Sequence, residues 1–465
     1  MTLDPSTFTV DSLTDAYRAG ELSPVEVTQA CLDRIAETEP ELNAYVVVDS
    51  ERALLAAGAS EARWQAAQPL SAVDGVPASV KDLVLMRGWA TRKGSPHTDP
   101  HDLATEDSPV AQRLLEAGAV VVGRTTTPEF GWKGVGDSPL TGITRNPWNP
   151  ELGPGGSSAG AAVAAATGSA VLNVGTDGGG SIRMPAAFCG VFGLKPTIAL
   201  VPLYPPGVSG LLSHLGPITP TVTDAAHMMS IVAVPDPREI YPTQRDDTSW
   251  IEGLDAGVVG LRVAYSRDYG HADVDPQIAA AVERTVSLLS DLGAIITEVD
   301  PGLPDCRDAF IALWDAAMAR GLAGLPDDRL ALSDPGLVAT MRRGLALTAQ
   351  QFLDADVVRQ QATLAINRLL VDHDVLVSPT LPITAFPVGS DVADSATQSH
   401  WVDWTPFTYP INMTRHPAAA IPVGLSSHGL PMSMQVVGNH FDDRRVLRVA
   451  RAVEMAQPFA RLPRL

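Results

Sequence analysis

The chain has very little cysteine. Its 465 residues contain three, Cys31, Cys189 and Cys306, which are odd in number, widely spaced and never arranged as C-x-x-C. A disulfide framework or a structural zinc site is therefore not expected. The scarcity fits a reducing, cytoplasmic setting. Cys189 has no cation or histidine beside it in the sequence, so we interpret it as a small core residue.

Positive charge is the second shortage. Lysine and arginine number 33 against 53 aspartates and glutamates, which gives a net charge of −20. An acidic surface repels phosphate backbones, so nucleic acid is not an expected partner. We interpret the excess of acidic residues as an aid to solubility.

Long apolar runs are absent as well. The most apolar segment, 159–174, is rich in small residues and is interrupted by Thr167, Ser169 and Asn173, so it is not expected to span a membrane. The first residues show no basic stretch followed by an apolar one, and no secretory signal is expected. No G-x-x-x-x-G-K-[ST] pattern occurs, which argues against a nucleotide-binding role.

What the chain does contain suits a large, loop-rich enzyme. Hydrophobic residues make up 45%, enough for a sizeable core, and there are 39 glycines and 38 prolines. At ~100–200 residues per domain the length allows two or three domains, but large α/β enzymes often form one. We expect a single domain over residues 1–465, with a motif-rich core at about 70–200.

Helix and strand patterns alternate along the chain. A helix is predicted to begin at Ser23-Pro24 and to stop at Pro40, with residues 42–48 as the following strand. The order helix, glycine, strand recurs at 108–123 and at 275–299. Further strands are predicted at 261–265, 375–377 and 432–437. This alternation predicts an α/β fold in which a large mixed sheet is covered by helices on both faces.

Two segments rich in glycine and serine, 153–160 and 176–183, flank an alanine-rich run. In the second, Ser181 follows three consecutive glycines. Such a pattern is typical either of backbone N–H groups gathered beside a nucleophilic hydroxyl or of a plain tight turn. Lys81 ends an apolar strand pattern, where a lysine either reaches solvent or is buried in a paired or neutral state.

Together with other motifs, these segments resemble the amidase signature family of serine hydrolases. The resemblance covers about residues 20–460 and is densest from Gly75 to Pro196. The matching motifs are Gly75-Val-Pro-Ala-Ser-Val-Lys-Asp82, Thr127-Pro-Glu-Phe-Gly131, Gly142-Ile-Thr-Arg-Asn-Pro-Trp-Asn149, Gly155-Gly-Ser-Ser-Ala-Gly160, Gly175-Thr-Asp-Gly-Gly-Gly-Ser-Ile-Arg183 and Cys189-Gly-Val-Phe-Gly-Leu-Lys-Pro196. Several long motifs in one order are far more specific than a single glycine-rich loop.

The resemblance implies the fold of that family and a Ser–Ser–Lys triad. By position, Ser181 is the nucleophile, Ser157 the bridging serine, which in the family follows a cis peptide bond, and Lys81 the base. The backbone N–H groups expected to hold the oxyanion belong to Gly178, Gly179, Gly180 and Ser181, and the expected supporting residues are Ser158, Asp177 and Arg183. No cofactor and no metal is expected.

A lysine can act as the base only when it is uncharged. Its usual pKa is ~10.4, and burial without a carboxylate partner lowers it. Asp82 adjoins Lys81, but neighbours on a strand point to opposite faces, so Asp82 need not pair with it. In the expected cycle Lys81 draws a proton from Ser181 through Ser157, Ser181 attacks the carbonyl carbon, and water then cleaves the acyl-enzyme.

Two other interpretations compete with this one. The run Gly156–Gly160 also fits G-x-S-x-G, which would make Ser158 the nucleophile of an α/β-hydrolase, but that elbow needs a strand directly before it, where this chain has three prolines. His97 and His101 are four residues apart, but Pro100 and the lack of a third ligand favour ordinary surface histidines over a metal site.

The expected reaction is hydrolysis of carboxylic amides, aryl or aliphatic; esters and carbamates (urethanes) fit the same chemistry. Met184 stands where the family's amidotransferase subunits typically have glutamine, which favours a stand-alone hydrolase over an amidotransferase component or a non-catalytic binding subunit. Arg415 occupies a position where glycine is common in the family. The sequence leaves open the substrate and the oligomeric state, a homodimer included.

Pocket walls are expected from segments 203–215, 307–347 and 400–417, which lie outside the strongest motifs. Within the last two, Trp314, Phe407 and Met413 either line an apolar pocket or pack in the core.

Overall fold

The computed structural model describes residues 3–207, 209–241, 243–244 and 246–462. Its main sheet has eleven strands in the described residues. They are β1 (Tyr45–Val48), β2 (Pro77–Lys81), β3 (Val120–Thr125), β6 (Leu172–Asp177), β7 (Phe192–Lys195), β8 (His214–Thr219), β9 (Arg262–Tyr265), β10 (Ile295–Glu298), β11 (Val375–Pro379), β12 (Ala418–Leu425) and β13 (Pro431–Gly438). A separate hairpin is formed by β4 (Asp137–Ser138) and β5 (Gly142–Ile143).

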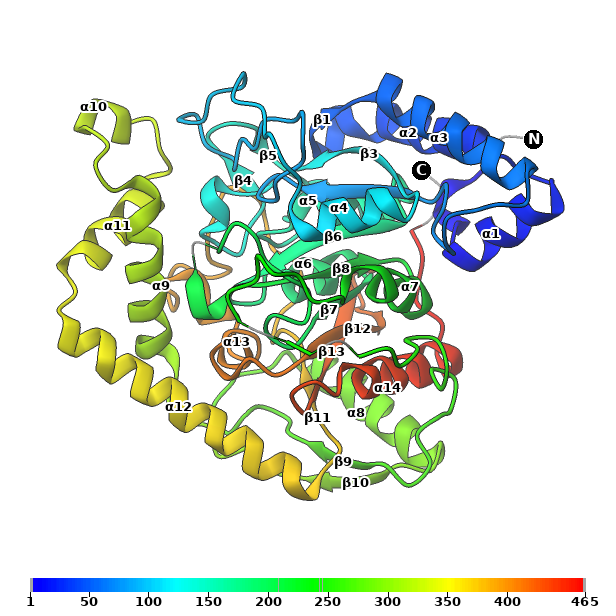
Figure 1. Ribbon diagram of the computed structural model, residues 1–465. Helices are drawn as coiled ribbons and strands as arrows, with labels where there is room; N and C mark the ends of the chain where they lie inside the picture. The colour runs from blue at the N-terminus through cyan, green and yellow to red at the C-terminus, as the bar shows by residue number, and fades with distance from the viewer. Residues whose placement is uncertain (1–2, 208, 242, 245, 463–465) are drawn as a thin grey trace.

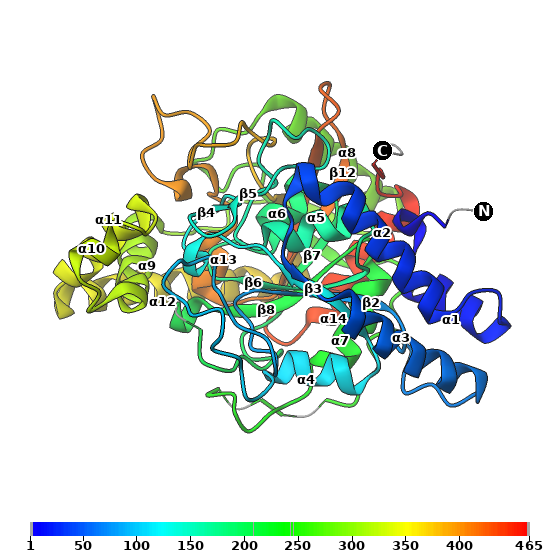
Figure 2. The ribbon, with the colours of Figure 1, turned by 90° about the horizontal axis from the view of Figure 1, so that it is seen from above.

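The sheet is mixed and crosses the centre of the molecule (Figures 1 and 2) in the order β1-β3-β2-β6-β8-β7-β12-β13-β11-β9-β10. Strand β2 runs parallel to both of its neighbours, β3 and β6, and β9 runs parallel to β10 and β11. The other neighbouring pairs are antiparallel. The mixed sheet expected from the sequence is therefore confirmed.

The described helices surround this sheet. The α-helices are α1 (Val10–Ala19), α2 (Pro24–Leu42), α3 (Ser50–Gln65), α4 (Pro109–Glu116), α5 (Ala159–Thr167), α6 (Arg183–Cys189), α7 (Val222–Val232), α8 (Pro276–Asp291), α9 (Arg307–Leu322), α10 (Asp327–Leu330), α11 (Pro335–Ala346), α12 (Ala349–Asp372), α13 (Tyr409–Thr414) and α14 (Asp443–Ala456). Short 3-10 turns are η1 (Pro5–Thr7), η2 (Glu129–Gly131), η3 (Gly210–Leu212) and η4 (Trp401–Trp404). In the described residues, none of the helices combines the length and apolar character needed to cross a membrane.

Both faces of the sheet are covered, as predicted. Side chains alternate between the faces along each strand, so Ala78 and Val80 of β2 join a core with α4, α7, α8 and α14. Val120 and Val122 of β3 join a second core with α2, α3, α5 and α6. Lys81 has the opposite parity to Ala78 and Val80, which directs its side chain toward the face that α5 covers.

Most predicted elements are present, but Pro40 does not end its helix. Helix α2 begins at the predicted cap and continues to Leu42, where Asn43 takes a left-handed conformation with φ of 50°. The Asn43 N–H donates to the Glu39 carbonyl at 3.0 Å. A proline in the last turn removes one helical hydrogen bond, and the turn closes around it. Strand β1 consequently begins at Tyr45 rather than at residue 42.

Helices α9 to α12 form an arm along one edge of the molecule, on the side away from α1 to α3 (Figure 1). The arm has its own apolar core, in which Phe310 and Trp314 of α9 pack with Trp401 of η4. This core lies against the loop after β6, because a Cβ added at Gly179 would lie 2.7 Å from the Trp401 ring. The arm therefore shapes the region where the glycine-rich loop lies.

Candidate active site

Lys81 is the last residue of β2 and is fully buried. Its Nζ lies 2.8 Å from Ser157 Oγ, 2.9 Å from Ser158 Oγ and 2.8 Å from Thr176 Oγ1. The two serines immediately precede or cap α5, and the Gly156–Ser157 peptide bond is cis, as the resemblance implies. The structure thus brings together Lys81 and Ser157, which separate sequence motifs had singled out.

Thr176 was not singled out by sequence reasoning, although it touches Lys81 directly. Its place follows from the sheet, because β2 and β6 are parallel neighbours with Val80 opposite Val174. Lys81 lies one residue beyond Val80 and Thr176 two residues beyond Val174, so both come at the same edge of the sheet. The sequence around each residue shows an apolar strand pattern. Only the strand order of the folded sheet reveals that Lys81 and Thr176 are neighbours.

The surroundings of Lys81 favour an uncharged amine. Burial lowers the pKa of Lys81 well below its usual value, and only the more distant Asp177 acts in the other direction. Asp82 turns away and pairs with Arg124 at 3.1 Å, as the parity of a strand predicts. In the part of the chain that the structure describes, Lys81 forms no ion pair with a carboxylate. A lysine in such a place can accept a proton.

Ser158 is held by three contacts. Besides accepting from Lys81, its hydroxyl donates to the Thr176 carbonyl at 3.1 Å and accepts the Thr176 N–H at 3.1 Å. No strand precedes it, because residues 146–158 are irregular. Both observations contradict the interpretation of Ser158 as the nucleophile of an α/β-hydrolase elbow.

Ser181 lies in the loop between β6 and α6 and is 3% exposed. Its carbonyl accepts the Ser158 N–H at 3.1 Å, which fastens this loop to the start of α5. Ser157, Thr176 and Ser181 line one cavity. No hydrogen bond joins the hydroxyls of Ser157 and Ser181 in the described structure.

The three glycines before Ser181 have no room for side chains. A Cβ at Gly178 would lie 2.9 Å from Ser209 Oγ and from the Trp314 ring, and one at Gly180 would overlap Thr408. Gly180 also has φ of +124°, which only glycine adopts readily. The backbone of this loop can therefore follow its path between Trp314, Trp401 and Thr408 only with glycine at these positions.

The N–H groups of this loop are not all available. Gly180 donates to Asp177 Oδ1 at 2.7 Å. The N–H groups of Gly178, Gly179 and Ser181 donate to no acceptor within the described residues. Of the four donors expected for an oxyanion, three are thus unengaged and one is committed to the carboxylate beside it.

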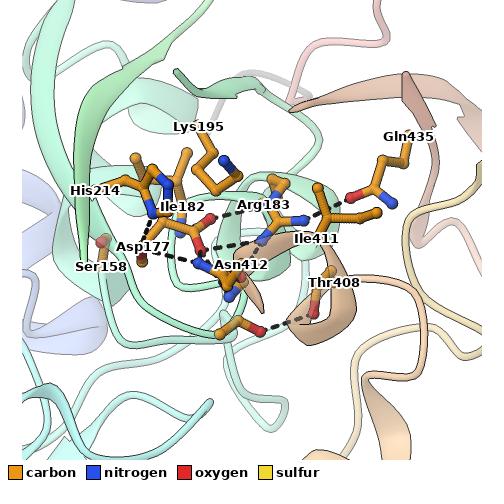
Figure 3. A network of polar contacts seen from close by, with 12 residues as sticks. Ser158, Asp177, Ile182, Arg183, Lys195, His214, Thr408, Ile411, Asn412 and Gln435 are labelled. Atoms are coloured by element: carbon orange, nitrogen blue, oxygen red, sulfur yellow. Dashed lines mark hydrogen bonds and ion pairs between the residues drawn. The ribbon is translucent and has the colours of Figure 1, made fainter. Parts of the chain in front are cut away.

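Asp177 is the hub of a buried polar network (Figure 3). Its carboxylate accepts from the Ile182 N–H at 3.2 Å, from Arg183 Nε at 3.0 Å and from Asn412 Nδ2 at 2.8 Å. Arg183 extends the network to Gln435 at 2.7 Å. Although burial alone would raise the pKa of Asp177, Arg183 holds it below its usual value. The contacts of Asp177 and Arg183 fasten the loop to α13 and β13.

Asn412 and Gln435 were missed by sequence reasoning. They come from α13 and β13, more than 200 residues after Asp177, and nothing in their local sequence marks them. The end of α13 also explains why glycine is common in the family at position 415. Arg415 ends this helix with φ of 65°. That left-handed conformation is the physical reason why glycine suits the position.

The cavity wall is mostly apolar. It takes Leu203, Tyr204 and neighbouring residues from the 203–215 segment, together with Trp314 and Met318 of α9. Two of the three segments expected to form walls therefore do so, residue 208 lying outside the described residues. No residue of 400–417 belongs to the wall, and Phe407 and Met413 pack in apolar cores.

Comparison with known proteins gives one consistent result. The profile of the Amidase family matches residues 26–447. The chain is 35% identical to an acylamidase of Rhodococcus erythropolis, over 95% of this chain and 94% of the relative. It is 33% identical to a component of the glutamyl-tRNA(Gln) amidotransferase of Thermosynechococcus vestitus, over 94% and 96% of the two chains. The crystal structure of a bacterial aryl acylamidase superposes with a TM-score of 0.90 at 28% identity, covering 97% of this chain and 96% of that one.

Proposed function

Because the chain belongs to the amidase signature family, whose members act on amide C–N bonds, we propose that it hydrolyses carboxylic amides with Ser181 as nucleophile, Ser157 as bridging hydroxyl and Lys81 as base. The observation that carries the assignment is the 2.8 Å contact between Ser157 Oγ and a buried lysine amine that has no carboxylate partner in the described residues. Such an amine is the base that a serine nucleophile requires.

The hydrogen bonds of Lys81 support a defined orientation of the amine. A neutral amine has two N–H groups and one lone pair. Ser158 gives its only hydroxyl hydrogen to the Thr176 carbonyl, so it must accept one N–H of Lys81. If the Thr176 hydroxyl accepts the second, the lone pair faces Ser157 Oγ. Thr176 then acts as a positioning residue, which keeps the basic electron pair on the side of the reaction.

The reaction then proceeds in two halves. Lys81 takes the proton of Ser157, which takes that of Ser181, while Ser181 Oγ bonds to the carbonyl carbon. The link between the two serine hydroxyls closes when substrate occupies the cavity, since such contacts often tighten only in the complex. Ser157 returns the proton to the departing amine nitrogen. Water, deprotonated by the same relay, cleaves the resulting ester and frees the acid.

Three backbone N–H groups are available for the negative oxygen of the tetrahedral intermediate. Those of Gly178, Gly179 and Ser181 have no other acceptor in the described residues. Each donor of this kind contributes ~3–4 kcal/mol to the transition state in hydrolases of similar chemistry. We assign Gly180 a different part: its N–H is held by Asp177, which fixes the loop instead.

Substrates with an apolar acyl or aryl group fit the cavity, whose wall includes Phe130, Trp314 and Met318. We propose acyl amides and anilides as the main class. Esters and carbamates, including urethanes, are second candidates because the same nucleophile attacks their carbonyl carbon. All three cysteines are buried and unpaired, which supports a reducing compartment such as the cytoplasm. We also propose a single domain, since one sheet takes strands from residues 45 to 438.

A role as an amidotransferase component is the alternative, because relatives with that function are nearly as similar as the acylamidase. Met184, buried beside Gly134 and Gly180, stands where those proteins typically have glutamine, which favours a stand-alone hydrolase. A glutaminase that works with partner subunits would hydrolyse glutamine and leave anilides intact.

The test is hydrolysis of 4-nitroacetanilide by the purified chain alone, followed by mass spectrometry of the trapped acyl-enzyme. The acetyl group should be found on the peptide that contains Ser181, and Ser181→Ala should reduce turnover by about 10⁴-fold or more. Ser230→Ala, on the outer side of α7, is the matched control and should keep full activity. Turnover that survives in Ser181→Ala, or an acetyl group on another residue, contradicts the assignment.

A further inference from the structure

Lysine is scarce in this chain, and three of the four lysines serve the interior of the fold. The four are Lys81, Lys93, Lys133 and Lys195. The amine of Lys81 lies among hydroxyls of the candidate active site, and that of Lys133 lies among three carboxylates. Lys195 is buried, and its amine donates to two backbone carbonyl oxygens. Lys93 has none of these surroundings.

Lys93 lines the same cavity as Ser157 and Ser181. Its side chain is half-buried, and its ammonium forms no hydrogen bond or ion pair within the described residues. The ammonium nitrogen itself is not buried, so a ligand can reach it. A lysine ammonium has three donors and no acceptor. Lys93 therefore brings a positive charge and three unused donors to the wall of the cavity.

The backbone of Lys93 is fastened to the active-site region. Its N–H donates to the Asp82 carbonyl at 3.1 Å, and its carbonyl accepts the N–H of Phe130, another lining residue, at 2.8 Å. Between these two bonds Lys93 has φ of 54°, a left-handed conformation that residues with a Cβ adopt infrequently. Such conformations are found preferentially at functional sites. The position would suit glycine better, yet it carries a long cationic side chain.

The rest of the cavity wall offers this ammonium no counter-charge. Asp177 is the one acidic residue among the described residues of the lining, and its carboxylate pairs with Arg183 at 3.0 Å. Much of the remaining wall is apolar, with Leu85 and Trp314 among its members. Because the ammonium sits on a flexible four-carbon stem, it can follow an anion placed in the cavity. A carboxylate is a suitable anion, since it accepts strong charge-assisted hydrogen bonds from an ammonium.

We propose that Lys93 binds a carboxylate of the substrate and thereby selects amides that carry a negative charge away from the scissile bond. The proposal rests on the function proposed above and narrows its substrate class. The carboxylate has two sources: the acyl part, as in monoamides of dicarboxylic acids, or the leaving amine, as in acylated aminobenzoates. In both cases the remaining, apolar part of the substrate meets the apolar wall.

Three variants test the charge of Lys93. Lys93→Met removes the charge and keeps a side chain of similar length, while Lys93→Arg keeps a cation at this position. Arg87→Met is the matched control, because Arg87 is exposed, belongs to the same loop and does not line the cavity. It changes the net charge of the chain by the same amount as Lys93→Met. Thermal unfolding of all three variants shows whether the fold is kept.

Two series of substrates distinguish the sources of the carboxylate. The first consists of the mono-4-nitroanilides of succinic, glutaric and adipic acid, each paired with its terminal carboxamide, which has the same shape without the charge. The second consists of 3- and 4-acetamidobenzoate, each paired with its carboxamide. Release of the aromatic amine is followed. For each pair the ratio of kcat/KM values, carboxylate over carboxamide, is compared between wild type and variants, which cancels intrinsic differences in reactivity.

Lys93→Met should lower this ratio by about tenfold in one of the two series, an effect between those of an exposed ion pair and of a desolvated hydrogen bond to a charged group. Lys93→Arg should keep most of the ratio, and Arg87→Met should keep all of it. The series that responds identifies the part of the substrate that carries the carboxylate.

A ratio unchanged in Lys93→Met for every pair, or lowered as much in Arg87→Met, would overturn the proposal. So would a wild type that hydrolyses 4-nitroacetanilide but none of the carboxylates; in these cases the proposed function stands. Inactivity of wild type on 4-nitroacetanilide and on all members of both series would instead overturn the proposed function and this inference with it.

Discussion

Lys81 and Lys133 are both buried, but their surroundings are opposite. The amine of Lys81 lies among hydroxyl groups, and burial lowers its pKa well below the usual value. The amine of Lys133 lies 2.8–2.9 Å from the carboxylates of Asp137, Asp334 and Asp391. Burial alone would lower the pKa of Lys133, but these carboxylates raise it above the usual value. The partners of a lysine, more than its burial, decide whether it is charged.

The two lysines also differ in what they connect. Lys133 follows η2, while Asp137 lies on β4, Asp334 caps α11 and Asp391 belongs to a loop before η4. One ammonium thus ties the arm of α9 to α12 to the body of the enzyme. Among the described residues, the hydrogen bonds of the Lys81 amine go to the hydroxyls of Ser157, Ser158 and Thr176 alone. The Lys133 amine holds distant segments together, whereas the Lys81 amine lies among hydroxyls with no carboxylate partner in the described residues.

The comparison is tested most strongly by the same substitution at both positions. We expect Lys81→Met to lower kcat by about 10⁴-fold, because removal of a base from a serine relay has effects of that size. Lys133→Met should change kcat less than about threefold, since its amine touches no atom of the relay. Steady-state hydrolysis of 4-nitroacetanilide at one pH measures both. Comparable losses in the two variants would mean that Lys81 acts through the fold and not as the base.

The substitution Thr176→Asp should make the Lys81 site resemble the Lys133 site. Thr176→Asp places a carboxylate beside the Lys81 amine. An adjacent opposite charge raises a lysine pKa by about 1–3 units, so the neutral fraction at pH 7 and the rate should fall by about 10- to 1000-fold. Raising the pH should restore activity, because the base is recovered when the ammonium loses its proton.

The pH profile of kcat/KM measures this shift, with Thr176→Asn as the uncharged control. In Thr176→Asp the acid limb should move to higher pH, while in Thr176→Asn it should stay close to that of wild type. A loss of activity in Thr176→Asp that no rise in pH repairs would indicate damaged geometry instead of a charged lysine.

The contrast between the two lysines also shows how far sequence reasoning reaches. Lys81 could be singled out because it ends an apolar strand pattern inside a long motif, and the motif order placed Ser157 and Ser181 with it. Those helices and strands that could be predicted followed from periodicity and caps, apart from Pro40, where a proline was taken as the end of α2. These are local signals, carried by residues close together in the chain.

Features that depend on distant segments were not predictable. The partners of Lys133 come from three other segments, and two of them lie more than 200 residues away. Asn412 reaches Asp177 only because α13 packs beside the loop after β6. Phe407 and Met413 illustrate the same limit: their sequence suits a cavity wall or a core equally well, and only the position of η4 and α13 decides.

The carboxylates around Lys133 should make this residue important for the stability of the fold. Lys133→Met leaves three carboxylates without their cation, and breaking a fully buried ion pair costs about 3–5 kcal/mol. Asp137 and Asp391 are about a third exposed, so solvent reduces the penalty and we expect a loss of about 2–3 kcal/mol in the free energy of unfolding. Denaturant titration at pH 7 measures it. A variant as stable as wild type would show that the cluster contributes no net stability.

The last difference between the two lysines concerns how the free energy of unfolding changes with pH. Between the lowered pKa of folded Lys81 and the unfolded value of ~10.4, the unfolded chain binds a proton that the folded chain does not, so wild type loses stability as the pH falls through that window. Lys81→Met lacks this loss, and its stability relative to wild type should rise by about 1.4 kcal/mol for each pH unit below 10. Lys133→Met is the control: the raised folded pKa leaves its amine protonated in both states below pH 10, so its difference from wild type should stay constant. Denaturant titrations at pH 8, 9 and 10 compare the three proteins, and a Lys81→Met curve parallel to that of wild type would mean that Lys81 is charged in the folded enzyme.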